Sequence, residues 1–385
     1  MKNDRKIIYF LLGFELVLLS VLMLVAVLRA GRDTKLPEAP AFAAGEIFQD
    51  SLYLNYYTSQ YDDKVPVGDA EYNYYTFSLS KDGIESHKYT EGLGITSGLA
   101  MTTLTDSQIT IKASKNASEP TVLNYGNLFI RNPYVRTSLS LKEVLSEPLK
   151  LKRLSGLSDN SVIIYHTHTM ESYCVTEEDR YRVQKTYNET KDNTRNVVAA
   201  GEWIRQSLLK HNITTLHDTT IHYENRVNGV WQDCYYFGLQ TLQKILAEQT
   251  KAQLVMDIHR DGVTNPAKDQ IRHKTTVKDE NGVEYAQIMF VVGLNYNEYY
   301  DQDDIYNPHW KENFKLALLL IEKLEERVPG ITVKNNRGIS LRREAYNQHL
   351  AQNTLLVEMG FDGNLVSEIE ASSKLLGEVI AEVYS

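Results

Sequence analysis

The 385-residue sequence has little cysteine, and this excludes a zinc site built from thiolates. Only Cys174 and Cys234 occur, and no C-x-x-C pair is present, although such pairs are typical of cysteine-ligated zinc. The two thiols can form a disulfide outside the cytoplasm or stay reduced. The spacing leaves both open, because it does not reveal whether the Cα atoms approach closely enough.

The sequence also lacks an excess of positive charge. Its formal net charge is −9, whereas binding to phosphate backbones favours a basic surface. We therefore expect no nucleic-acid partner. The serine-nucleophile pattern G-x-S-x-G and the glycine-rich phosphate-binding and dinucleotide-binding patterns are absent as well, which removes three common enzyme classes.

One long hydrophobic run is present, near the N-terminus. Residues 7–28 are nearly all apolar, with Glu15 as the one charge, and this length suits a helix that crosses a membrane. Three basic residues precede the run and favour a cytoplasmic N-terminus: Lys2, Arg5 and Lys6. We expect an uncleaved single-pass anchor in the cell membrane, with the bulk of the chain extracytoplasmic. The alternative is a signal peptide cleaved among the alanines that follow: Ala39, Ala41 and Ala43.

The amino-acid composition and the hydrophobic pattern divide the chain into four predicted parts. The predicted parts are a cytoplasmic tip and membrane anchor, a linker, a small β-rich extracytoplasmic region and a catalytic domain, at residues 1–28, 29–45, 46–150 and 151–385. The linker contains Pro37 and Pro40 among alanines and charges. In the β-rich region, short alternating runs at residues 108–111 and 128–130 are typical of strands.

From residue 151, short apolar runs alternate with helical patterns. Strands are predicted at residues 162–165, 254–258, 288–294 and 355–357. Amphipathic helices are predicted at residues 196–210, 235–248, 309–327 and 365–383. This alternation favours the α/β class, with a mostly parallel sheet flanked by helices.

Chemically capable side chains follow three of these strands. His168 and Glu171 form an H-x-x-E pair after the first strand, His259 follows the second, and Glu358 follows the last. Open α/β sheets bind ligands at the carboxyl ends of their strands. Each residue taken alone fits a structural role, but together they match a catalytic zinc site, which combines imidazole and carboxylate ligands with one open position.

Roles can be assigned within this set. We expect His168, Glu171 and His259 to bind Zn²⁺ and Glu358 to act as general base on a zinc-activated water. Arg260 is a candidate for stabilising an oxyanion or binding a substrate carboxylate. His166 is the alternative to His168. Asp257 and Asp261 are both candidates to hold the second nitrogen of His259.

Several ordered motifs resemble the stage II sporulation protein P family. They are Ile-Tyr-His-Thr-His-Thr at 164–169 with Glu171-Ser172-Tyr173, Leu216-His217-Asp218 with His222, Asp257-Ile258-His259-Arg260-Asp261, Gly338-Ile339-Ser340, Tyr346-Asn347-Gln348, and Val357-Glu358-Met359-Gly360 with Asn364. The resemblance implies a zinc-dependent N-acetylmuramoyl-L-alanine amidase with a fold similar to zinc amidases and metallocarboxypeptidases. It also implies peptidoglycan hydrolysis during engulfment, endopeptidase activity, and stage II sporulation proteins D and M as partners.

Two departures leave alternatives open. Residues 226–239 lack the Ser- and Tyr-bearing pattern expected of the family and carry Trp231 and Cys234 instead. Related amidases place their glutamate ligand further along the chain, which here would fall near Glu189 or Asp192 rather than at Glu171. A zinc endopeptidase or carboxypeptidase acting on stem peptides, and a non-catalytic peptidoglycan binder, are the competing functions.

Overall fold

The structure of the chain is a computed structural model that describes residues 72–90, 104, 108–114, 120–133, 138–154, 156, 159–181, 188–262, 271–295 and 307–385. The chain divides into two compact units, residues 1–64 and 65–385, and all described residues belong to the second. The predicted membrane anchor and linker lie outside the described residues. Within the described part, no helix combines the length and apolar character needed to cross a membrane.

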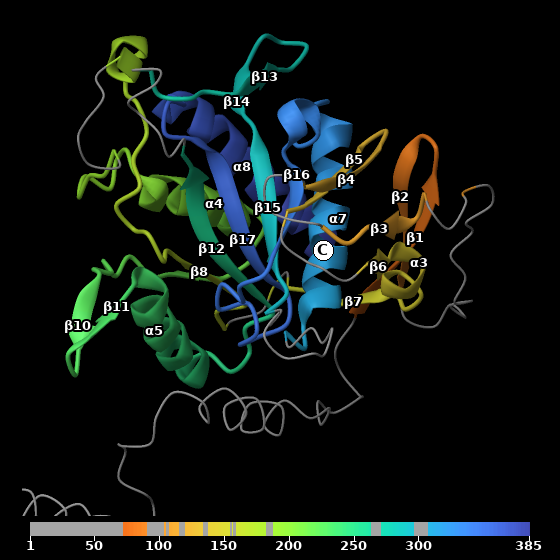
Figure 1. Cartoon of the computed structure of the whole chain (residues 1–385), viewed down its shortest axis with the longest axis horizontal. Helices are drawn as coiled ribbons and strands as arrows, with labels where there is room; N and C mark the ends of the chain where they lie inside the picture. Colours follow the sequence, from red (N-terminus) through yellow and green to blue (C-terminus); the bar gives the residue numbers. More distant parts are fainter. Residues whose placement is uncertain are drawn as a thin grey trace, which may run out of the picture. The chain divides into compact units, whose positions relative to one another are not determined.

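An eight-stranded sheet forms the centre of the described unit (Figure 1). Its strands, in spatial order, are β4 (Thr121–Tyr125), β5 (Leu128–Asn132), β16 (Gly338–Arg342), β15 (Ile288–Gly293), β17 (Thr354–Phe361), β12 (Leu254–Asp261), β8 (Val162–Tyr165) and β9 (Thr215–His217). Neighbours pair in parallel except β4 with β5 and β15 with β17. The predicted mostly parallel sheet is therefore confirmed.

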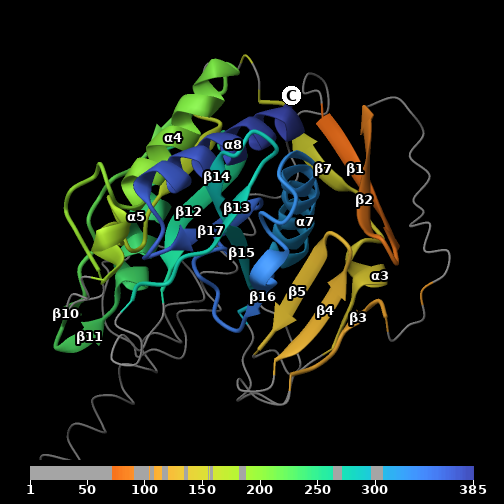
Figure 2. The same cartoon turned by 90° about the horizontal axis from the view of Figure 1, so that it is seen from above.

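Four helices cover the two faces of this sheet. They are α4 (Val197–Lys210), α5 (Cys234–Glu248), α7 (Trp310–Arg327) and α8 (Val366–Tyr384). Alternate side chains of β8 enter different clusters, because successive strand residues point to opposite faces. Ile164 packs in the cluster that contains residues of α4, α7 and α8, and Ile163 packs with α5. Figure 2 shows α4 and α8 side by side over the sheet.

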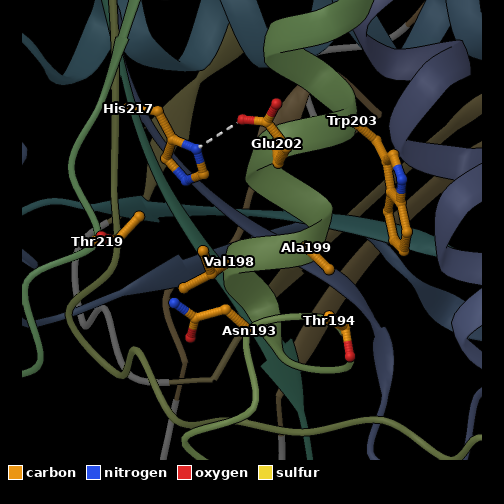
Figure 3. A pocket seen from close by; sticks show the side chains of 8 residues that line it. All are labelled: Asn193, Thr194, Val198, Ala199, Glu202, Trp203, His217 and Thr219. Atoms are coloured by element: carbon orange, nitrogen blue, oxygen red, sulfur yellow. Dashed lines mark hydrogen bonds and ion pairs between the residues drawn. The ribbon is translucent and has the colours of Figure 1, made fainter.

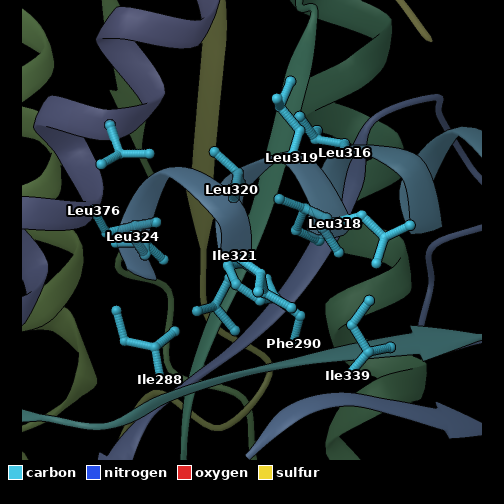
Figure 4. Packing of buried hydrophobic residues seen from close by; sticks show 14 of the residues in the cluster. Ile288, Phe290, Leu316, Leu318, Leu319, Leu320, Ile321, Leu324, Ile339 and Leu376 are labelled. Atoms are coloured by element: carbon cyan, nitrogen blue, oxygen red, sulfur yellow. The ribbon is translucent and has the colours of Figure 1, made fainter. Parts of the chain in front are cut away.

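The helix starts follow from short polar caps. The Asn196 side chain accepts a hydrogen bond from the backbone N–H of Val198, and Asp233 does the same for Tyr236 at the start of α5. Both satisfy donors that a helix leaves unpaired at its first turn. Helix α7 is buried on most sides, and its leucines pack over strands β15 and β16 (Figure 4). The residues of this contact include Leu318, Ile321, Phe290 and Ile339.

Smaller elements complete the unit. A three-stranded sheet joins β2 (Gly83–Thr90), β1 (Tyr72–Ser80) and β7 (Leu149–Lys152). Two-stranded pairs are β3 (Thr110–Ile111) with β6 (Leu139–Ser140), β10 (Asn225–Val227) with β11 (Val230–Gln232), and β13 (Thr276–Lys278) with β14 (Glu284–Ala286). The short helices are α3 (Leu141–Val144), η1 (Glu177–Tyr181) and η2 (Lys334–Asn336).

Strands β12 and β17, which carry two of the predicted site residues, are longer than the sequence predicts. Strands β12 and β17 continue past the predicted ends at residues 258 and 357, because they pair with each other further than β12 pairs with β8. His259 lies opposite Glu358, and a register shift follows before Asp261. These two site residues therefore lie inside the carboxyl-terminal parts of their strands and not just after them, and that prediction was wrong by three or four residues.

Strands from both sides of the predicted boundary at residue 150 share the large sheet. Strands β4 and β5 precede that boundary, yet β5 pairs in parallel with β16. The small sheet is attached to the end of the chain, since the Tyr75 hydroxyl donates to the Val383 carbonyl at 2.7 Å. Cys174 and Cys234 are both buried free thiols, so the disulfide alternative is not formed.

Candidate active site

The four predicted site residues converge at the carboxyl ends of β8, β12 and β17. His259 and Glu358 face each other across the β12–β17 pair. After β8, the chain turns so that the His168 ring lies 5.3 Å from the His259 ring, centroid to centroid. A Glu171 carboxylate oxygen lies 3.5 Å from Nδ1 of His259. Parallel strands thus bring together residues that are almost 200 positions apart in the sequence.

The two ring nitrogens of His259 have different neighbours. Nδ1 faces Oε2 of Glu171, while Nε2 lies 3.0 Å from Oδ1 of Asp257. Asp257 is held in place by Thr167, whose backbone N–H and hydroxyl donate to its two oxygens at 2.8 and 2.6 Å. Asp257, and not Asp261, is therefore the carboxylate beside the His259 imidazole, the place that partners of metal-binding histidines take, although the contact is an ion pair and Nε2 makes no hydrogen bond among the described residues.

The charges in this cluster depend on one another. Burial alone would raise the pKa of Asp257, but His259 and the hydrogen bonds from Thr167 lower it to about 2. The pKa of Glu171 is likewise lowered, because His259, Arg260 and His168 outweigh its burial. Burial opposes the charged form of His259, yet the two carboxylates raise its pKa well above the usual value. Both carboxylates are thus ionised at neutral pH.

Glu358 differs from these carboxylates. Its pKa is raised above the ordinary range, first by burial and then by the negative charge of Asp261. Its Oε2 atom is buried and has no hydrogen-bond partner among the described residues. A carboxyl group whose pKa approaches the working pH can accept and release a proton readily. This environment suits the general-base role predicted for Glu358.

His168 and His166 lie in different environments. The His168 ring is half-buried and has no hydrogen-bond partner within the described part of the chain. His166 is fully buried, with Nδ1 3.0 Å from the Ile258 carbonyl oxygen and Nε2 2.9 Å from Nε2 of His217. Both nitrogens of His166 are therefore engaged, and this favours His168 as the ligand.

Arg260 contributes its backbone to the site. Its N–H donates to Oε2 of Glu171 at 3.0 Å. Its guanidinium is mostly buried and lies 3.4 Å from the Asn188 carbonyl oxygen. The structure therefore gives Arg260 an orienting contact with Glu171, while its predicted role toward an oxyanion or substrate carboxylate stays a prediction.

The alternatives to Glu171 lie elsewhere. Glu189 is exposed and meets Glu171 through a backbone bridge. Asp192 accepts hydrogen bonds from the backbone and hydroxyl of Thr194. Glu171 is the carboxylate beside His259, which favours it over both.

Two tyrosines at this site were not predicted. The Tyr235 ring, in the first turn of α5, stacks on the His259 ring at 6.1 Å and meets the His168 ring edge-on at 5.3 Å. The Tyr346 ring meets Tyr235 at 5.2 Å. Tyr235 lies in a helical pattern, and nothing in its spacing marks it as part of a site. The Tyr346-Asn347-Gln348 motif was the one available signal for Tyr346.

The donor chemistry of the cluster fits zinc. Two imidazoles and a carboxylate are ligands that zinc accepts, and Nδ1 of His259 and Oε2 of Glu171 converge. Among the residues described here, however, no three His, Cys, Asp or Glu side chains are arranged to hold a metal ion. The zinc assignment therefore stays a prediction that rests on donor type, on the unpaired Glu358 oxygen and on a His168 ring that makes no hydrogen bond within the described residues.

A separate pocket of about 370 Å³ lies beside α4 (Figure 3). It is lined by Asn193, Thr194, Val198, Ala199, Glu202, Trp203, His217 and Thr219. His217 faces Glu202, with Nδ1 of His217 3.4 Å from Oε2 of the carboxylate. None of the predicted site residues lines it, so this pocket is separate from the candidate site at the strand ends.

Comparison with known proteins identifies the family. The model of the family described as Stage II sporulation protein P (SpoIIP) matches residues 100–381, which is well over half of the chain. The chain belongs to the SpoIIP family. The match includes all five predicted site residues as well as strands β4 and β5, so the family region begins before the catalytic domain predicted from residue 151.

One SpoIIP relative and three solved structures provide further comparisons. Stage II sporulation protein P of Bacillus subtilis (strain 168) is 28% identical over 231 residues, which cover 58% of this chain and 51% of the relative. This chain thus aligns with about half the length of that relative.

Similar solved structures are two N-acetylmuramyl-L-alanine amidases named Ami1 and one N-acetylmuramoyl-L-alanine amidase. The Ami1 of Mycobacterium smegmatis has a TM-score of 0.34 at 11% identity, covering 60% of this chain and 98% of that one. The Ami1 of Mycobacterium abscessus has 0.28 at 12%, covering 58% and 99%. The amidase of Clostridium difficile 630 has 0.26 at 13%, covering 59% and 96%.

Proposed function

We propose that the chain is a peptidoglycan hydrolase of sporulating cells that cleaves the amide bond between N-acetylmuramic acid and L-alanine. Membership of the SpoIIP family supports the sporulation role. The observation that carries the hydrolytic chemistry is the cluster at the strand ends. There the two ring nitrogens of His259 face two different carboxylates, Glu171 and Asp257. Glu358 lies opposite His259 on the neighbouring strand and has a buried, unpaired carboxyl oxygen.

His168, Glu171 and His259 would hold Zn²⁺ in this proposal. When bound, zinc supplies Lewis acidity, which polarises a scissile carbonyl and lowers the pKa of a water molecule toward neutrality. The ion pair between Asp257 and Nε2 of His259 would orient the ring, so that Nδ1 faces the Glu171 carboxylate. The Arg260 N–H holds Glu171 in turn, so each proposed ligand but His168 has a partner that orients it.

Glu358 would move the proton. Its carboxylate takes a proton from the attacking water as the bond to the amide carbon forms, and it then delivers that proton to the leaving L-alanine nitrogen. Burial and the nearby Asp261 charge raise its pKa. A raised pKa makes Glu358 a stronger base and also a competent donor once protonated. The Arg260 guanidinium is the candidate to stabilise negative charge on the tetrahedral carbon's oxygen.

The cellular setting completes the proposal. Residues 7–28 would anchor the chain in the membrane with the hydrolase outside the cytoplasm, as their apolar length suggests. Stage II sporulation proteins D and M are the partners that family membership suggests.

The first test replaces the proposed base. We predict that Glu358→Gln lowers the rate of peptidoglycan cleavage by at least 10²-fold and leaves bound zinc near that of the unmodified chain, because Gln keeps the shape but cannot take a proton. Metal analysis and release of soluble fragments from purified peptidoglycan measure both. Glu248→Gln is a matched control, since Glu248 is an exposed glutamate at the far end of α5 and outside the cluster. Normal cleavage by Glu358→Gln would refute its role as the base.

Product mapping separates the amidase from its competitor. An amidase leaves free lactyl groups on muramic acid and new N-terminal L-alanine. A zinc endopeptidase or carboxypeptidase acting on stem peptides leaves only new peptide ends. Mass spectrometry of the digest distinguishes the two, and peptide ends without free lactyl groups would overturn the amidase proposal.

A further inference from the structure

The loop that follows β16 carries two residues in an unfavourable backbone conformation. Tyr346 and Asn347 have φ values of 49° and 58°. This left-handed region is uncommon for residues other than glycine, and asparagine tolerates it better than tyrosine does. Such a conformation costs free energy and persists only where the surroundings impose it. The position of Tyr346 is therefore specified by its neighbours.

Those neighbours form a rigid support. The fully buried Gln348 accepts a hydrogen bond from the Gly293 N–H at 2.8 Å and donates to the Val291 carbonyl at 2.7 Å. At Gly293 there is no room for a side chain, because a Cβ atom would lie 2.6 Å from the Ala345 carbonyl oxygen. The loop is thus fixed against the carboxyl end of β15 on both sides of Tyr346.

The same loop is tied to α5. The Asn347 side chain donates to the Tyr235 carbonyl at 3.3 Å, and the two tyrosine rings meet at 5.2 Å with an interplanar angle of 72°. Tyr235 in turn stacks on His259 and contacts His168 edge-on. A continuous aromatic surface therefore runs from the proposed ligands to Tyr346. Both tyrosines are only half-buried, so part of each is accessible.

We propose that Tyr235 and Tyr346 bind the sugar ring of the residue whose amide is cut, and so determine specificity for a glycan-linked substrate. This inference rests on the proposed amidase function, in which the scissile carbonyl is attached to muramic acid through its lactyl group. A pyranose ring presents a face of C–H groups that matches an aromatic surface in size and polarity. Tyrosine provides that surface together with a hydroxyl at its edge.

The stem peptide fits this surface less well. Its first residue on the leaving side is alanine, whose single methyl group is small beside two aromatic rings. The sugar is attached on the acyl side of the bond and must lie within a few bonds of the reacting carbonyl. A rigid surface in contact with the His168 and His259 rings is therefore placed to hold it. Tyr346 contacts neither histidine in the described structure, which makes it the better position to test.

The experiment compares two substrates with and without the sugar. One is a muropeptide, and the other is a lactyl-peptide with the same amide but no sugar. Tyr346→Leu should raise KM for the muropeptide about tenfold and change kcat, zinc content and cleavage of the lactyl-peptide little. Tyr346→Phe should restore most of the affinity, because it keeps the ring. Tyr236→Leu is the matched control, since its ring pairs with Phe237 at 5.2 Å and not with Tyr235.

A binding measurement keeps this test independent of catalysis. Calorimetry with the Glu358→Gln chain measures muropeptide affinity without cleavage, with and without Tyr346→Leu. If the amidase proposal fails and the chain cuts nothing, a loss of muropeptide affinity in Tyr346→Leu still supports the sugar site. Equal affinity in both chains would overturn it. So would an equal loss for the lactyl-peptide, because the tyrosine would then contact a part that both ligands share.

Tyr235 needs a second readout because it touches both proposed ligands. Tyr235→Leu should weaken muropeptide binding in the Glu358→Gln background as Tyr346→Leu does, with zinc affinity within about threefold of that of the parent. A fall in zinc affinity with unchanged muropeptide affinity would contradict the proposal for Tyr235, because its ring would then act only by packing the histidines.

Discussion

At the scale of single residues, His166 and His168 show how far a sequence motif alone can identify a metal ligand. They lie two positions apart after one predicted strand, and the sequence predicted His168 as the ligand with His166 as the alternative. In the structure, His166 is enclosed by Ile258, His217 and Gly201, and a Cβ at Gly201 would lie 3.0 Å from its ring. His168 faces the His259 ring. The choice depends on contacts with residues 50 and 90 positions away, which spacing does not encode.

The two histidines should therefore respond differently to truncation. We predict that His168→Ala lowers zinc affinity at least 100-fold with little loss of fold stability, because the half-buried ring makes contacts with the Tyr235 and His259 rings but no hydrogen bond within the described residues. His166→Ala should keep zinc but lower the free energy of unfolding by about 2–4 kcal/mol, because it leaves a cavity and unpaired buried groups. Metal analysis and denaturant unfolding measure the two effects. The reverse pattern would make His166 the ligand.

The aspartate that lies beside His259 could not be predicted from the sequence either, because it also depends on contacts between distant residues. The sequence named Asp257 and Asp261 as equal candidates to orient His259. After His259 the register between β12 and β17 shifts, because β17 has one extra residue there; Asp261 pairs with Arg337 at 2.7 Å, and Asp257 lies beside the His259 ring. A one-residue irregularity in a strand depends on its pairing partner, so no local pattern predicts it.

At the scale of elements, the helices and strands were largely predictable because their signals are local. Helix α4 begins one residue after the predicted Asn196, which is its cap, and α5 begins at Cys234 where residue 235 was predicted. The ends of β12 and β17 were missed because they depend on how far two strands pair. The joining of β5 to β16 depends on a contact across more than 200 residues, which periodicity does not reveal.

One contact between elements gives a prediction for pH. The carboxylate of Glu322 on α7 accepts a hydrogen bond from the backbone N–H of Ser86 on β2 at 2.8 Å. Burial raises the pKa of Glu322 despite that bond. Because the folded pKa lies above the unfolded one, ionisation of Glu322 costs stability, and this cost grows as the pH rises from the unfolded pKa through the folded pKa.

Glu322→Gln should remove this dependence. Gln keeps the oxygen that accepts from Ser86 and carries no charge, so we predict that it raises the unfolding midpoint at pH 7 by roughly 2 °C. Below about pH 3, where the glutamate is protonated in both states, the two chains should unfold at the same temperature. Thermal unfolding across this pH range measures the difference, with Glu248→Gln as an exposed control on α5. A constant difference at every pH would exclude ionisation as the cause.

At the scale of the whole molecule, the proposed metal would link distant parts of the chain. His168 and Glu171 follow β8, whereas His259 lies on β12 after the intervening α4 and α5. These segments lie apart in the unfolded chain, so the complete ligand set forms only on folding. A ligand that binds the folded state stabilises it in proportion to the logarithm of its concentration relative to Kd. Zinc should therefore appear as a contribution to global stability as well as to catalysis.

Metal removal gives the last prediction. With zinc at about 1,000 times its Kd, binding adds roughly 4 kcal/mol to the free energy of unfolding, so a chelator should lower the unfolding midpoint by several degrees. Glu171→Ala, which removes one proposed ligand, should unfold at nearly the same temperature with and without the chelator. Glu358→Gln should still respond to the chelator like the parent, because Glu358 is proposed to transfer the proton and not to bind the metal. A chelator response in Glu171→Ala equal to that of the parent would show that the stabilising metal binds elsewhere, and the zinc assignment at the strand ends would then be wrong.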